Sequence, residues 1–118
     1  MIRTLLAAAL ALCATSALAQ PAPQLTGEQQ TLLHCSATCA LVSGRQHAGD
    51  KEAMAFPDIT QRGREYFVRA LVQLMDEAGL DHDAVARLVQ AEAAKLQDSP
   101  DLLKQMPACL ASLDASKL

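Results

Sequence analysis

The sequence is poor in aromatic residues, glycine and proline. Its 118 residues include no tryptophan, one tyrosine and two phenylalanines, with five glycines and five prolines. A hydrophobic core must therefore be built mostly from leucine, valine, alanine and methionine. The alternation of apolar and polar residues that is typical of a half-buried strand is also missing, as is any internal repeat. These absences indicate an all-α protein.

The sequence motifs of common catalytic sites are missing as well. It has no H-E-x-x-H motif, no glycine-rich phosphate loop, no paired-carboxylate signature and no Ser-His-Asp order. It also lacks the C-x-x-C-H motif of a c-type haem site and the C-x-x-C motif of a thioredoxin-like protein. A short chain with few polar groups on its apolar faces has little room for a pocket, so we expect no enzymatic activity and no cofactor.

The N-terminal segment contains the longest apolar run. Arg3 supplies a positive charge, residues 5–12 contain no polar side chain, and the small residues Ala17 and Ala19 follow. This order of basic, apolar and small-x-small segments is typical of a cleavable secretory signal. We therefore expect residues 1–19 to be removed and the protein to be exported, either periplasmic or secreted.

Two alternatives for this segment are less consistent with its residues. A transmembrane anchor needs roughly 20 apolar residues, and the run from Thr4 to Ala19 is shorter. A lipoprotein would be modified at Cys13, but a small residue is then expected before that cysteine, and Leu12 stands there. We therefore expect no transmembrane anchor, and Cys13 leaves with the signal peptide.

Cleavage would leave a short, acidic mature chain. It would have 99 residues, enough for one domain. Loss of Arg3 leaves nine basic and thirteen acidic side chains, a net charge of −4. Such a surface repels phosphates, so we expect no nucleic-acid partner. The core of a chain this short is thin, burying about 65% of the unfolded surface, and an oxidising compartment offers a disulfide as an additional brace.

Helical periodicity begins at Thr26, after a short lead over residues 20–25 that we expect to be flexible. Residues 26–118 are expected to form a single helical domain. The apolar positions predict helices over about 26–47, from 58 or 60 to 78, over 81–96 and from 99 onward, with a helical turn at 51–55. Pro107 lacks a backbone donor, so we expect the last helix to be kinked or split there. The predicted fold is a small bundle of about four antiparallel helices.

Residues at the expected helix ends support these boundaries. Thr26 and Gln29 have the spacing of a capping box at the first helix. Gly79 suits the left-handed position that ends a helix, and Asp81 suits the cap that begins the next one. Ser99 precedes Pro100 as a capping residue before a proline at the first helical position.

Three cysteines remain after the predicted cleavage: Cys35, Cys39 and Cys109. On one helix, Cys35 and Cys39 would have Cβ atoms about 5–6 Å apart, farther than the 3.5–4.5 Å of a disulfide. Either one can instead pair with Cys109 in the last helix. We favour a disulfide between Cys35 and Cys109, with pairing of Cys39 to Cys109 left open, and Cys39 as a buried free thiol.

A metal site is the alternative role for these cysteines. Two thiolates four residues apart, Cys35 and Cys39, can bind a soft ion such as Cu(I) or Zn(II), with His34 or Cys109 as a further ligand. His34 lies about 100° around the helix from Cys35, which does not favour this ligand set. A single C-x₃-C pair is only a weak indication of a metal site.

A second candidate for chemistry is the arginine-rich segment of residues 62–69. Arg62, Arg64 and Arg69 lie near Tyr66, and such a group can contact an anion or the carboxylates of a partner. The simpler interpretation has Phe67 in the core, Tyr66 at its border, and the arginines solvated or paired with acids. We favour this simpler interpretation.

The segments GREYFVRA, LMDEAGLDHDAV and MPACLASLDAS also carry a resemblance. In these segments the chain resembles a group of small exported helical proteins of alphaproteobacteria that have no known function. The resemblance implies a periplasmic or secreted helical protein and assigns no catalytic or ligand residue.

The sequence therefore predicts an exported, non-enzymatic interaction or accessory domain braced by one disulfide. The alternative is a Cu(I)- or Zn(II)-binding protein that uses Cys35 and Cys39. A protein partner is expected but is not identified by any motif, and the chain itself is expected to be a monomer or a homodimer.

Overall fold

The computed structural model describes residues 23–116, and this part of the chain is helical with no strand. The elements are α1 (Gly27–His47), α2 (Lys51–Met54), α3 (Thr60–Ala78), α4 (His82–Gln97), the short 3₁₀ helix η1 (Leu102–Gln105) and α5 (Met106–Ala115). The predicted small all-α bundle is confirmed. The predicted signal peptide lies outside the described residues. None of the helices within 23–116 combines the length and the apolar character needed to cross a membrane.

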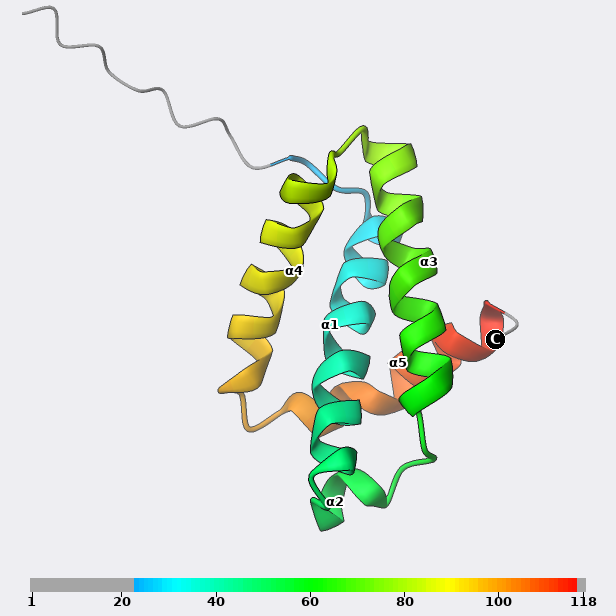
Figure 1. The fold of residues 1–118 in the computed structure, drawn as a ribbon, viewed down its shortest axis with the longest axis vertical. Coiled ribbons are helices and arrows are strands. Elements are labelled where there is room, and N and C mark those ends of the chain that lie inside the picture. Colours follow the sequence, from blue (N-terminus) through cyan, green and yellow to red (C-terminus); the bar gives the residue numbers. More distant parts are fainter. Residues whose placement is uncertain (1–22, 117–118) are drawn as a thin grey trace, which may run out of the picture.

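Helix α1 is the centre of the bundle. It contacts α2, α3, α4, η1 and α5, most extensively α3 and α4. The chain runs down α1, back up α3 and down again through α4, so consecutive long helices are antiparallel (Figure 1). From Cys35 to Cys39 every residue of α1 is buried, because neighbours cover the helix on all sides there.

Local side-chain chemistry sets the ends of the long helices. The Thr26 hydroxyl accepts from the Gln29 amide at 3.2 Å, while the Gln29 side chain accepts from the Thr26 amide at 3.0 Å. This is the predicted capping box. Gly79 ends α3 with φ of 65°, a left-handed conformation that glycine adopts at little cost, and the Asp81 carboxylate caps α4 through the Ala84 amide. These predicted caps are confirmed.

The last part of the chain is split next to Pro107, as predicted. Leu102–Gln105 forms a 3₁₀ turn, and α5 begins at Met106 with Pro107 in its first turn, where the missing N–H leaves no hydrogen bond unmade. The expected helix start at Ser99 was wrong. The Ser99 hydroxyl accepts from the Asp101 amide in a turn, and helical structure begins only at Leu102.

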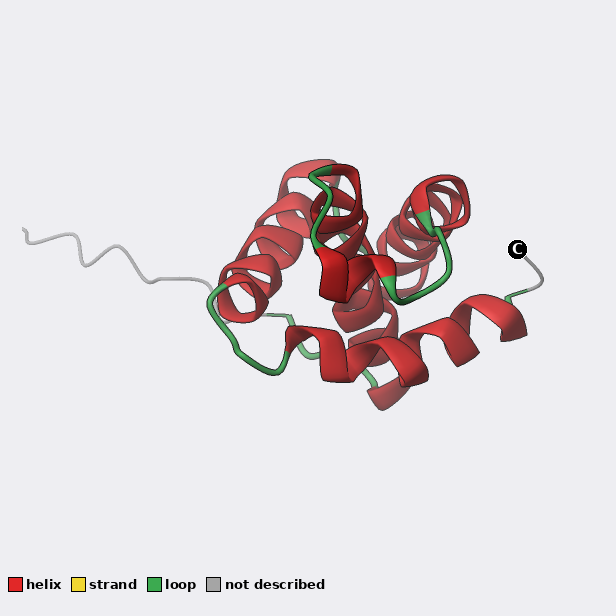
Figure 2. Ribbon diagram, turned by 90° about the horizontal axis from the view of Figure 1, so that it is seen from below, coloured by secondary structure: helices red, strands yellow, loops and turns green. Residues whose placement is uncertain are grey.

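Helix α5 runs across the direction of the long helices and packs against α1 and α3 (Figures 1 and 2). Its buried residues Met106, Cys109 and Leu113 join the larger hydrophobic cluster, which also contains Val42 and Ile59. A smaller cluster of Leu33, Leu74 and Val85 lies between α1, α3 and α4. The core is therefore mostly aliphatic, with Tyr66 as its buried aromatic residue, in agreement with the scarcity of aromatic residues.

The Gln46 side chain bonds to backbone groups of α2 and of the connection between α2 and α3. Its amide nitrogen donates to the carbonyl oxygens of Ala53 and Pro57, both at 3.0 Å, and its oxygen accepts from the Ile59 amide at 3.3 Å. These contacts give partners to backbone groups outside the helical hydrogen-bond pattern of α3 and fix the segment that leads into it.

Candidate functional site

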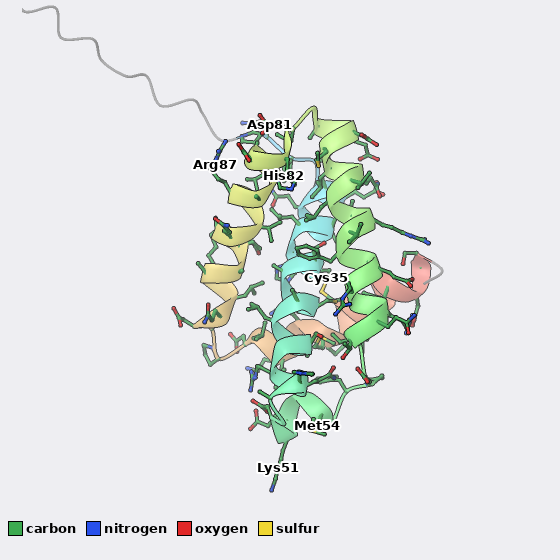
Figure 3. All side chains as sticks on the ribbon, in the orientation of Figure 1. Cys35, Lys51, Met54, Asp81, His82 and Arg87 are labelled. Atoms are coloured by element: carbon green, nitrogen blue, oxygen red, sulfur yellow. A yellow bond between two sulfur atoms is a disulfide. The ribbon has the colours of Figure 1, made fainter. Side chains whose placement is uncertain are left out.

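The disulfide joins Cys35 of α1 to Cys109 of α5, as predicted, with a Cα–Cα distance of 5.2 Å. It is visible as the yellow bond near the Cys35 label in Figure 3. Both cysteines are buried, with exposed fractions of 2% and 0%. The bond therefore fastens the transverse helix α5 to the middle of the central helix, inside the core.

Cys39 is the free thiol, and it is fully buried. Its Cβ lies next to Gly63 of α3, and a Cβ added to that glycine would lie 3.6 Å from it. Burial disfavours the charged thiolate and raises the pKa of the Cys39 thiol to about 11. The thiolate is the reactive and metal-binding form of cysteine, so Cys39 is suited to packing rather than to nucleophilic chemistry.

His34 links α1 to two other segments. Its Nδ1 lies 3.0 Å from Oε1 of Glu92 in α4, and its Nε2 lies 3.1 Å from Oε1 of Gln105 in η1. Both ring nitrogens are thus engaged in contacts that hold α4 and η1 to α1. No sequence pattern indicated this bridge, because its other two members are 58 and 71 positions away from His34.

The predicted metal ligands are not brought together as a ligand set. The Cys35 sulfur is bonded to that of Cys109, the Cys39 thiol is protonated and buried, and both nitrogens of His34 have other partners. Across residues 23–116, no group of three or more histidine, cysteine, aspartate or glutamate side chains is placed to hold a metal ion.

The arginine-rich segment contributes to packing as well as to the surface. The Tyr66 hydroxyl lies 2.8 Å from Oγ of Ser112, and Nη2 of Arg62 donates to Asp114 at 2.7 Å, so both residues fasten α3 to α5. Tyr66 is only 2% exposed and is out of reach of a partner. Arg64 and Arg69 are exposed on α3.

The expected positions of the two aromatic residues of α3 were wrong. Tyr66 is in the core and Phe67 is half-buried. Tyr66 shares the buried side of α3 with Gly63, Ala70 and Leu74, and the Ser112 hydroxyl gives its own hydroxyl a partner there. Phe67 lies instead at the start of an open groove between α3 and α4.

This groove is apolar along most of its lining, and it has a volume of about 420 Å³. It is lined by Phe67, Val68, Leu71, Val72, Met75, His82, Val85, Ala86, Val89 and Gln90. Val68 and Val72 form its outer edge and are 55% and 50% exposed. We call these two residues, one turn apart on α3, the valine ridge.

On its other side the valine ridge borders a second hollow, of about 390 Å³, which carries charge. Arg69, Gln73, Asp76 and Glu77 line it together with the two valines. Gln73 donates to Glu77 at 2.9 Å. Arg69 and Asp76 are exposed, and within residues 23–116 no ion pair of either one is found. Of the residues on this surface, only Arg69 was among the partner contacts predicted from the sequence, although Val68 and Val72 at a spacing of four were a visible signal.

No protein-family model, no curated protein sequence and no solved structure matches this chain.

Proposed function

We propose that the protein is an exported, non-enzymatic interaction domain whose valine ridge binds an apolar helix of a protein partner. The observation that carries the proposal is the exposure of Val68 and Val72 beside the apolar groove. Single exposed apolar residues are common, but a contiguous apolar patch with a polar rim marks interaction sites. Aliphatic side chains one turn apart, next to a groove between two helices, suit an amphipathic helix as the ligand.

The chemistry of the groove supports binding rather than catalysis. Of its ten lining residues only His82 and Gln90 are polar. The His82 side chain is 88% exposed. Catalytic sites gather several polar groups around one point in a concave setting, and the lining of this groove offers no such group.

Export is supported by two independent features. The segment of residues 1–19 has the order of a secretory signal. The disulfide between Cys35 and Cys109 is of a kind that forms and persists in oxidising compartments and is rare in the cytosol.

Site-specific photo-crosslinking in cells of the source organism tests the proposal. A photoreactive amino acid replaces Val72 in the full chain, and the matched control carries it at Met54. Met54 is also exposed, at 59%, but lies at the opposite end of the molecule from His82 (Figure 3). We expect a discrete adduct from position 72 and none from position 54, with the purified chain beginning at Gln20 by intact mass.

Each part of the proposal can fail separately in this experiment. Equal crosslinking from both positions, or none from position 72, contradicts a binding role for the valine ridge. A chain that retains residues 1–19 and fractionates with the cytosol contradicts export.

A further inference from the structure

Resting on the proposed function, we infer that the partner on the valine ridge is a second copy of this chain, with the two α3 helices packed antiparallel about Val72. The described surface of α3 carries the valine ridge along its centre and opposite charges along one flank.

The valine ridge points directly away from the core of its own chain. Residues of an α-helix are separated by about 100°, so Val68 and Val72 lie about 160° to either side of Ala70. Ala70 is buried against the bundle at 2% exposure. No neighbouring helix of the described chain covers the side of α3 that the ridge occupies, and another helix can approach it there without moving α1 or α4.

The charges beside the valine ridge of one copy can pair with those of a second copy only when the two α3 helices are antiparallel. Arg69 and Asp76 line the same hollow on one flank of α3 and are seven residues, or about 10 Å, apart along the helix. In an antiparallel pair centred at Val72, Arg69 of each copy lies within about 1.5 Å of the level of Asp76 in the other. In a parallel pair, a two-fold axis along the helices would put this flank of the two copies on opposite sides of the contact, so Arg69 of one copy would not meet Asp76 of the other.

The same register also matches the apolar side chains. Val72 meets its own equivalent at the centre, and Val68 of each copy lies within about 1.5 Å of the level of Met75 in the other. Met75 is half-buried at the border of the apolar groove. The contact uses one patch twice, so it closes as a two-fold dimer and leaves no free site for further growth.

A pair of charge reversals tests both the partner and the register by sedimentation equilibrium of the full chain. Arg69→Glu places two acids opposite each other at both ends of the dimer, and Asp76→Arg places two arginines there. We expect the apparent mass of the unsubstituted protein (the parent) to double with rising concentration. The dissociation constant of the dimer should be about tenfold higher for each variant.

An equimolar mixture of the two variants should restore the dimer. In the mixed pair, the acid introduced at position 69 of one copy faces the arginine introduced at position 76 of the other. At the opposite end, the unchanged Asp76 faces the unchanged Arg69. Opposite charges therefore meet at both ends, and the mixture should dimerise about as tightly as the parent.

Matched variants at exposed apolar positions complete the experiment. Val72→Glu should abolish the dimer, while Met54→Glu should leave it unchanged, and unchanged far-ultraviolet circular dichroism shows that both variants fold. A parent that stays monomeric overturns the inference, as does a mixture that dimerises no better than the separate variants. A monomeric parent together with a crosslinked adduct of a different protein at position 72 leaves the proposed function standing and rejects only the second copy.

Discussion

At the scale of single residues, burial determines what the cysteines can do. Cys35 and Cys109 are joined by the disulfide, and Cys39 is buried, which disfavours its thiolate. The participation of Cys109 could be predicted from the sequence, because the spacing of Cys35 and Cys39 on one helix made a bond between those two unfavourable. The same spacing left open which of the two pairs with Cys109. The state of Cys39 could not be derived in the same way, since it depends on Gly63 of α3 coming close to it.

Thiol labelling should show this protection. Because the pKa of the Cys39 thiol is about 11, only about one molecule in a thousand carries the thiolate near pH 8, compared with about one in ten at the ordinary value of 9.0. With full burial added, we expect labelling by a chromogenic disulfide reagent to be at least ~100-fold slower in the folded protein than in denaturant.

The Cys39→Ala variant is the control for that measurement and should release no chromophore in either condition. Rapid labelling of the folded parent would show that the thiol is accessible, and the packing role of Cys39 would have to be given up.

At the scale of helices, the sequence predicted where the helices begin and end better than which side chains of each helix are buried. The caps at Thr26, Gly79 and Asp81 depend on residues within a few positions of each other, so the sequence contains the whole interaction. The order of Tyr66 and Phe67 depends on Ser112, 46 positions away from Tyr66. The groove between α3 and α4 likewise arises from how two helices diverge, which no single helical pattern records.

Alanine substitutions at the glycine inside α3 and at the glycine that ends it should change the free energy of unfolding in opposite directions. Gly63 lies inside the helix, and an added Cβ would be 3.6 Å from that of Cys39, an ordinary contact. Gly63→Ala should therefore raise the free energy of unfolding by about 0.5–1 kcal/mol, because alanine loses less backbone entropy in a helix.

Gly79→Ala should lower the free energy of unfolding by about 1 kcal/mol. An added Cβ there has open space, but φ of 65° is unfavourable for any residue with a Cβ. Urea denaturation followed by circular dichroism measures both variants. Equal effects of the same sign at the two positions would contradict the roles assigned to these glycines.

At the scale of the whole molecule, the fold depends on holding a transverse helix against a small bundle. The sequence predicted the all-α class and the break near Pro107, because helical periodicity and the missing proline donor are local properties. It did not predict that α5 crosses the other helices or that Tyr66 and Arg62 fasten it. Those contacts span about half of the chain, with separations of 46 and 52 positions.

Removal of the disulfide should cost a large part of the stability. Cys35 and Cys109 are 74 positions apart, and a crosslink over a loop of that size contributes roughly 4 kcal/mol by restricting the unfolded chain. The double variant Cys35→Ala/Cys109→Ala should lose about 2–4 kcal/mol in chemical denaturation, and reduction of the parent should have a similar effect. A loss below ~0.5 kcal/mol would mean that packing alone holds α5 in place.

The Gln46 side chain has a consequence for which sequences can encode this fold. Its amide group replaces the backbone hydrogen bonds that a helix or a strand would give this segment. The amide nitrogen donates and the amide oxygen accepts, and the length of the side chain sets how far both can extend. Glutamate would offer no donor to the carbonyls of Ala53 and Pro57, and asparagine is one methylene shorter. The same contacts fix the number of residues between Ala53 and Ile59. An insertion or deletion there would move the bonded backbone groups out of hydrogen-bond distance of the Gln46 amide.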